Sequence, residues 1–175
     1  LILDLMNALL VPTSKYHHKE STNKKRIVKT SISDARKSFL NQVALMNDLH
    51  TSIQIEIDNA YKEKKTLQPL ICVVGADFQI AKDFYVYYFN TYYKFSSIIR
   101  AVDICFKIFQ VFNLKYSIQS ILVWTFIQHY FYNIHCESDV TPVSTSTLVA
   151  QSLYFEHIKI LFLPNDLTLL NNAVC

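Results

Sequence analysis

The chain has 175 residues, of which 51% are hydrophobic and 18% are charged, with a net charge of +3 at pH 7. This length predicts about one domain, and the composition excludes a disordered chain, which would be poor in hydrophobic residues and rich in charge. The single glycine also argues against a glycine-rich phosphate loop, which needs several positions with positive φ or close backbone approach.

The first twelve residues, LILDLMNALLVP, are apolar but lack a basic start and a small-residue cleavage pattern, so we do not interpret them as a signal peptide. Because the chain begins with Leu1, we expect a fragment or a processed product. Residues 13 to 31 are polar and show no apolar period, which predicts a loop or flexible basic arm. Between Lys15 and Lys37 the net charge is +6, so the rest of the chain sums to −3.

The next segments carry clearer patterns. Residues 33 to 46, SDARKSFLNQVALM, fit either a helix capped by Ser33 or a short strand centred on residues 39 to 45, and we favour the strand. Apolar residues then recur at helical spacing, with lysines at the end, which predicts an amphipathic helix over residues 47 to 65. The unbroken apolar run PLICVVG, residues 69 to 75, predicts a strand buried on both faces and covered by a layer on each side.

The aromatic segments FYVYYFN and YYKF, separated by an Asn-Thr pair at residues 90 and 91, predict a β-hairpin. A helix capped by Ser96 or Ser97 follows, and its sequence IIRAVDICFKIFQVF confines the polar residues to one narrow stripe. Within it, Asp103 and Lys107 have the spacing of a favourable i,i+4 ion pair. So wide an apolar arc indicates a helix that packs on a sheet and on a neighbouring helix together.

Residues 117 to 136 contain no formal charge and are long enough to cross a bilayer. Lipid would make unpaired polar groups in this segment costly. Four polar residues fall on one helical face: Thr125, Gln128, His129 and Tyr132. The pattern therefore favours an amphipathic helix, capped by Ser117, that forms a helical hairpin with residues 97 to 113.

These elements together predict an α/β fold: a small sheet with a crossover helix, an aromatic β-hairpin and a C-terminal helical hairpin. We expect three parts along the chain. Residues 1–31 form an apolar start and a flexible basic arm, residues 32–136 form a single α/β domain, and residues 137–175 form a Ser/Thr-rich linker and a tail of unclear order.

The succession LQPLICVVG, then FYVYYFNTYYKFSSIIRAVDICFKIFQVFNLKYS, then VWTFIQHYFYNI resembles a module of uncharacterised animal proteins that often lies C-terminal to a sterile alpha motif (SAM) domain. The resemblance covers about residues 39 to 135, departs at both ends, and includes no sterile alpha motif domain in this chain. It implies that this chain has the architecture of that module and that other domains accompany it in a larger protein. It carries over no catalytic residue, because no activity is established for that module.

Candidate catalytic groups are few. Asp77 follows the strand at residues 69 to 75, at the end where ligands bind in open α/β sheets. With Asp83 and Glu56 it could form an acidic metal site for a hydrolase. The alternative, which we favour, is that Asp77 makes a turn with Gly75.

The histidines and cysteines predict no site, and we expect no cofactor. The four cysteines are widely scattered, unlike a zinc site or a disulfide framework, which favours a reducing, intracellular compartment. His135 and Cys136 are neighbours that would point about 100° apart on a helix, which is unsuitable for a catalytic dyad. His129 is expected to be a half-buried histidine, and His17 with His18 would make only a weak metal site.

Two segments predict binding. Four basic residues of the arm could contact nucleic-acid phosphates, and KKRIVK weakly resembles a nuclear import signal: Lys24, Lys25, Arg26 and Lys29. The dense tyrosines of the hairpin could form a protein-contact face, because tyrosine gives a large contact area at low entropy cost: Tyr85, Tyr87 and Tyr92. The alternative for this second face is that helices bury it.

The sequence therefore predicts a non-enzymatic protein-interaction or scaffold module of a larger intracellular protein, cytoplasmic or nuclear. The alternatives are a nucleic-acid-binding accessory module that acts through the basic arm, and a metal-dependent hydrolase that uses Asp77. An unknown protein is the expected partner, with nucleic acid second, and a membrane is not expected. The oligomeric state does not follow from the sequence.

Overall fold

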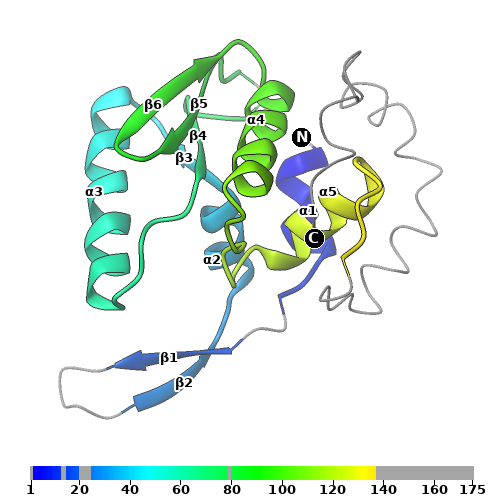
Figure 1. Ribbon diagram of the computed structural model, residues 1–175. Helices are drawn as coiled ribbons and strands as arrows, with labels where there is room; N and C mark the ends of the chain where they lie inside the picture. The colour runs from blue at the N-terminus through cyan, green and yellow to red at the C-terminus, as the bar shows by residue number, and fades with distance from the viewer. Residues whose placement is uncertain (1, 13–14, 20–24, 79, 137–175) are drawn as a thin grey trace.

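The computed structural model describes residues 2–12, 15–19, 25–78 and 80–136. There the chain forms an α/β fold, with a four-stranded mixed sheet between helices and a separate two-stranded ribbon (Figure 1). The helices are α1 Ile2–Leu9, α2 Ile32–Phe39, α3 Met46–Lys62, α4 Ile98–Val111 and α5 Ile121–Tyr130. The strands are β1 Lys15–Lys19, β2 Lys25–Lys29, β3 Leu40–Val43, β4 Leu70–Val74, β5 Asp83–Tyr88 and β6 Thr91–Phe95. The predicted fold class is confirmed.

The sheet has the order β3-β4-β5-β6. β3 and β4 are parallel, with Leu40 opposite Ile71, and parallel strands require a crossover connection, which α3 provides. β4, β5 and β6 are antiparallel neighbours. The helix predicted over residues 47 to 65 and the strand predicted at residues 69 to 75 are therefore confirmed.

β4 is buried on both faces, as its unbroken apolar sequence predicts. Ile71 and Val73 belong to the larger core cluster, together with residues of α2, α4 and α5. Leu70 and Cys72 belong to a second cluster with Leu49 of α3. Figure 1 shows the same division, with α3 on one side of the sheet and α4 on the other.

Trp124 of α5 joins three helices in the larger core. Its ring centroid lies 5.1 Å from that of Phe39 in α2 and 5.1 Å from that of Phe109 in α4. All three side chains are at most 1% exposed. Aromatic contacts at this distance and burial hold the helical layer together on this face of the sheet.

Residues 32 to 43 contain both of the elements that the sequence offered as alternatives. Ser31, not Ser33, caps α2: its Oγ accepts from the Asp34 backbone N–H at 3.0 Å, and the Asp34 carboxylate accepts from the Ser31 N–H at 3.1 Å. This reciprocal capping box satisfies two N–H groups that the helix leaves unpaired. The helix ends at Phe39, and β3 starts at the next residue.

The predicted aromatic hairpin is present, but its turn lies one residue earlier than the Asn-Thr pair. Tyr88 pairs with Thr91, which leaves Phe89 and Asn90 as the two turn residues. Both have positive φ, 47° and 60°. A two-residue turn with positive φ at both positions matches the twist of an antiparallel hairpin.

α5 is shorter than predicted. It begins after Ser120 rather than Ser117 and ends at Tyr130. Ser120 makes no side-chain cap to the helix, and its Oγ instead donates to the Ser38 carbonyl at 3.4 Å. Among the described residues, no helix is long and apolar enough to cross a membrane.

The basic segment contains a β-ribbon. β1 and β2 pair in antiparallel fashion, from Lys15 opposite Lys29 to Lys19 opposite Lys25. The prediction of a loop over residues 13 to 31 is therefore wrong for β1 and β2. The polar sequence concealed the strands, because two strands pair through backbone groups and this pairing by itself needs no apolar period.

α1 contributes to the larger core through Leu3 and Met6, and Leu10 follows it there. Part of the segment expected to precede the domain thus packs into the same core as α2 and α5. The division of the chain into three parts stays a prediction, and its last part, residues 137–175, lies outside the described residues.

Gly75 provides the first test of the fold. A Cβ added at this position would lie 2.9 Å from the Ala81 Cα, and φ is +157°. We expect Gly75→Ala to lower the free energy of unfolding by about 1–3 kcal/mol, because the backbone of residue 81 must move. Urea unfolding measures the change. Ala76→Ser, at the exposed neighbouring position, is the control, and an equal effect of both substitutions would contradict the close approach.

Candidate functional site

The three tyrosines predicted to contact a partner lie on the face of the hairpin that α3 covers. Tyr87 is 5% exposed, and Tyr85 and Tyr92 are partly buried against the same cluster. The Tyr92 hydroxyl lies 3.2 Å from Nδ1 of His50, a residue of α3. Most of the area of these side chains therefore faces the protein's own helix, and their role in partner contact stays a prediction.

A different aromatic group is exposed where the hairpin turn meets the end of α4. Phe89 is 86% exposed, Val111 72% and Phe112 57%. The Tyr88 ring centroid lies 6.3 Å from that of Phe89 and 5.4 Å from that of Phe112. We call these four residues, Tyr88, Phe89, Val111 and Phe112, the turn surface. Contiguous exposed apolar groups of this kind mark interaction sites in soluble domains.

Phe89 is costly to the fold in two ways. Its φ of 47° places a bulky side chain in the left-handed region, which costs an L-residue roughly 1–2 kcal/mol. Its side chain is also left in water, so little burial offsets that cost. Glycine or asparagine would suit this turn position better. A residue that is unfavourable both locally and in burial indicates a functional position.

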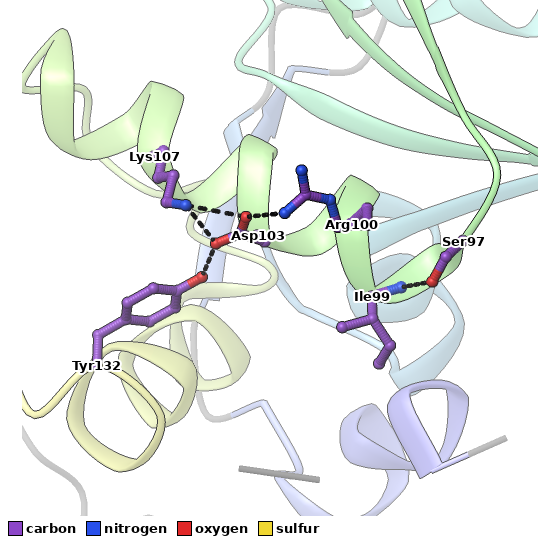
Figure 2. A network of polar contacts seen from close by, with 6 residues as sticks. All are labelled: Ser97, Ile99, Arg100, Asp103, Lys107 and Tyr132. Atoms are coloured by element: carbon purple, nitrogen blue, oxygen red, sulfur yellow. Dashed lines mark hydrogen bonds and ion pairs between the residues drawn. The ribbon is translucent and has the colours of Figure 1, made fainter. Parts of the chain in front are cut away.

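Asp103 of α4 is a buried carboxylate at the centre of a polar network (Figure 2). The Tyr132 hydroxyl donates to its Oδ1 at 2.6 Å, and Lys107 Nζ lies 3.0 Å from the carboxylate. Arg100 approaches more loosely, at 3.8 Å. A buried charge is tolerated only when it is paired and hydrogen-bonded, so this network ties the segment after α5 to α4.

The chemistry of this network is that of a structural contact. Burial, and then the hydrogen bond to Asp103 and its charge, raise the pKa of Tyr132 above its usual value. The phenol therefore remains a proton donor to the carboxylate. Its ring also stacks on Phe106, with centroids 4.0 Å apart, which leaves the hydroxyl directed into the protein.

A second polar chain lies beside the first. Gln110 Nε2 donates to the Tyr116 hydroxyl at 2.8 Å, and this hydroxyl donates to Gln128 Oε1 at 2.7 Å. Gln128 Nε2 donates in turn to the Ile134 carbonyl at 3.3 Å. The four polar residues that the sequence places on one helical face are buried, because Thr125, Gln128, His129 and Tyr132 are each at most 8% exposed.

The three carboxylates weighed for a metal site have separate surroundings. Glu56 pairs with Lys37 at 2.6 Å, and Asp83 pairs with Lys94 at 2.6 Å. The exposed Asp77 accepts backbone bonds from residues 80 and 81 through its carbonyl, as a turn residue does. Over the ranges that the structure describes, no three His, Cys, Asp or Glu side chains are grouped so that they could hold a metal ion.

The histidines near the end of α5 lie together. The rings of His129 and His135 have centroids 4.5 Å apart, with His129 buried and His135 exposed. Cys136 is disulfide-bonded, so it offers no thiolate nucleophile. A disulfide is also more usual in oxidising compartments, which counts against the reducing compartment predicted from the cysteine spacing.

A hollow of about 270 Å³ lies between α2, β3 and α3. Four of its polar lining residues are already engaged with one another or with the fold. Asn41 and Ser52 exchange hydrogen bonds at 3.0 and 3.2 Å, Gln42 Nε2 donates to the Gly75 carbonyl, and Lys37 pairs with Glu56. Within the lining, nothing indicates a missing ligand.

The residues predicted to bind nucleic acid lie on or beside the ribbon. Lys25, Arg26 and Lys29 belong to β2, and Lys29 is exposed. Lys24 lies outside the described residues. Sequence reasoning did not include Lys15 and Lys19, which β1 places opposite Lys29 and Lys25.

No protein-family model, curated protein or solved structure matches the chain. The resemblance to a module that accompanies a sterile alpha motif domain therefore stays a prediction.

Removing the Tyr132 hydroxyl tests the Asp103 network. We expect Tyr132→Phe to lower the free energy of unfolding by about 1–3 kcal/mol, because a buried carboxylate loses a short hydrogen bond. Chemical denaturation followed by circular dichroism measures the change. Tyr61→Phe is the control, at an 82% exposed position of α3, and equal values for the two variants would show that the hydroxyl contributes nothing.

The buried thiols give a pH dependence. Burial raises the pKa of Cys72 from 9.0 to about 12 and also raises that of Cys105. As the pH rises, the unfolded chain loses these protons before the folded chain does. Stability is therefore complete below pH 9 and falls towards pH 12, by about 1 kcal/mol per pH unit for Cys72.

Urea unfolding at pH 8 and pH 10 in oxygen-free buffer measures this loss. The Cys72→Ala variant serves as the comparison, since it lacks the titrating group and should show a smaller fall between the two pH values. A wild-type stability that is constant or rises over this interval is the contrary result.

Proposed function

We propose that this chain is a non-enzymatic protein-interaction module of a larger intracellular protein, and that the turn surface makes the contact. The observation that carries the proposal is Phe89, an exposed aromatic residue in a left-handed turn position. Selection for folding alone favours glycine or asparagine there. A partner that buries Phe89 would supply the reason for a residue that the fold itself disfavours.

The turn surface also has the composition of an interaction site. Aromatic residues dominate the energetics of protein interfaces, because each buries a large area with few rotatable bonds. The Tyr88 ring lies near both Phe89 and Phe112, and this neighbouring aromatic ring restricts the orientations of the two exposed rings. Preorganised side chains lose less entropy on binding.

Two lysines lie close in sequence to the α4 part of the turn surface. Lys107 lies one helical turn before Val111, and Lys115 follows Phe112 by three residues. Lys107 and Arg100 both pair with the Asp103 carboxylate, whereas Lys115 is exposed beyond the end of α4. We therefore expect a protein partner that presents apolar side chains flanked by carboxylates, because complementary charges at the rim favour the correct encounter.

Two sequence features support the parts of the proposal that concern the larger protein and its location in the cell. The resemblance to a module found beside sterile alpha motif domains supports a multidomain setting, and KKRIVK supports a nuclear or cytoplasmic location. The disulfide at Cys136 is the observation that opposes this location.

Phe89→Gly separates binding from folding. It removes the exposed ring and relieves the left-handed backbone, so we expect unfolding stability to stay equal or to rise by about 1 kcal/mol. Binding to a partner should weaken at least tenfold, as for a central aromatic contact. Proteins captured by crosslinking in cells would be purified, and their affinity for wild type and variant compared by calorimetry.

Tyr61→Ser is the matched control, because it removes an aromatic side chain that is 82% exposed on α3. A partner of the turn surface keeps its affinity for this control and loses it with Phe89→Gly and Phe112→Ser. A partner that binds all variants alike refutes the proposed surface. Sedimentation of the purified chain completes the test, because a dimer that Phe89→Gly dissociates would replace the proposed partner by a second copy.

A further inference from the structure

The register of the β1–β2 ribbon gathers lysines on one face. Successive residues of a strand alternate between its two faces, and paired residues share a face. Lys15 pairs with Lys29, His17 with Ile27, and Lys19 with Lys25. One face of the ribbon therefore carries four lysines, which we call the lysine face: Lys15, Lys19, Lys25 and Lys29. Arg26 is opposite His18 and belongs to the other face.

This arrangement opposes like charges at both ends of the ribbon. Cross-strand neighbours lie about 5 Å apart, and like charges directly opposite one another destabilise an antiparallel pair. The pairs Lys15–Lys29 and Lys19–Lys25 both have this relation. An isolated ribbon gains nothing from it, whereas a bound polyanion would remove the repulsion at both ends.

The dimensions of the lysine face favour a long polyanion over a single anionic group. The two lysine pairs are separated by four residues, or about 13 Å along the strands. Figure 1 shows the ribbon extending away from the four-stranded sheet and the labelled helices. Between the pairs, Ile27 is 62% exposed. A single aliphatic residue there offers little for insertion into a lipid interface, which uses several large apolar side chains.

We propose that the lysine face of the β1–β2 ribbon binds double-stranded DNA through its phosphates. The major groove of B-form DNA is wide enough to admit a two-stranded ribbon. Lysines at both ends of such a ribbon meet the phosphates that border the groove, and phosphate contacts of this kind are independent of base sequence. This site is separate from the turn surface, so the ribbon and the protein contact can act in one molecule.

The register also separates two neighbouring residues that have the same charge. Lys25 and Arg26 are adjacent in sequence and equal in charge, yet they lie on opposite faces of the ribbon. Binding through the lysine face depends on Lys25 and hardly on Arg26. Binding by net charge alone depends on both to the same extent.

The test uses fluorescence anisotropy of the full chain with a labelled 20-base-pair duplex of mixed sequence. Four phosphate contacts predict that the affinity falls roughly 100-fold between 50 and 200 mM salt. At 50 mM salt, Lys25→Gln should weaken binding roughly tenfold, and Arg26→Gln by less than about threefold. Substituting glutamine for all four lysines of the lysine face should abolish detectable binding.

A second variant matches the charge change of the fourfold substitution. It replaces four exposed lysines outside the ribbon by glutamine, and it should keep most of the affinity: Lys62, Lys64, Lys65 and Lys82. Circular dichroism of each variant confirms that it is folded. Equal losses in the two fourfold variants would overturn the proposal, as would equal losses in Lys25→Gln and Arg26→Gln.

Two further outcomes would also overturn it. Wild-type binding that is absent, or insensitive to salt, contradicts contact through phosphates. Vesicles that contain phosphatidylserine form the other arm of the experiment. If they bind the wild type more tightly than the duplex does, and through the same four lysines, the ligand of the lysine face is an anionic membrane surface instead of DNA. Because the turn surface is unchanged in every variant, these outcomes leave the proposed protein contact unaffected.

Discussion

The burial of β4 on both faces is the constraint on which the rest of the fold depends. A strand of five apolar residues, Leu70 to Val74, gains hydrophobic free energy only if a layer covers each of its faces. α3 covers one face through Leu49 and Ile53, and α2, α4 and α5 cover the other. Because α3 is also the crossover between β3 and β4, the connection that makes the sheet parallel at this point is the same helix that closes its second face.

This layering decides which aromatic residues are left for contact with other molecules. The side of the hairpin that carries Tyr85 and Tyr87 is turned towards α3, and these side chains pack against the core cluster on that side. At the turn of the hairpin, Phe89 and Phe112 are exposed on either side of Tyr88, whose ring lies near both of theirs. The exposed surface thus lies at the turn of the hairpin, whereas the tyrosines along its strands pack against α3.

The polar contacts between α4 and the segment after α5 have a different role. Replacing a buried ion pair by apolar groups often leaves a protein equally stable, so such a pair is weak evidence for stability by itself. Here Asp103 combines Lys107 of its own helix with Tyr132 of a distant segment. Apolar packing alone would allow that segment to slide along α4, whereas a short, directional bond to a buried carboxylate selects one position. The parallel chain through Tyr116 and Gln128 has the same effect.

The sequence by itself determined the features that depend on residues a few positions apart: the helices α3 and α4, the strand β4 and the Asp103–Lys107 pair. It narrowed the cap of α4 to Ser96 or Ser97, and the structure selects Ser97. It also located the aromatic hairpin and the basic segment. Only the tertiary structure decided which face of the hairpin α3 covers, that the polar face of α5 is buried, and that Lys15 and Lys19 stand opposite the lysines of β2. Local spacing assigns residues to faces, but which face meets another layer, and in what register two strands pair, depends on segments that are distant in the chain.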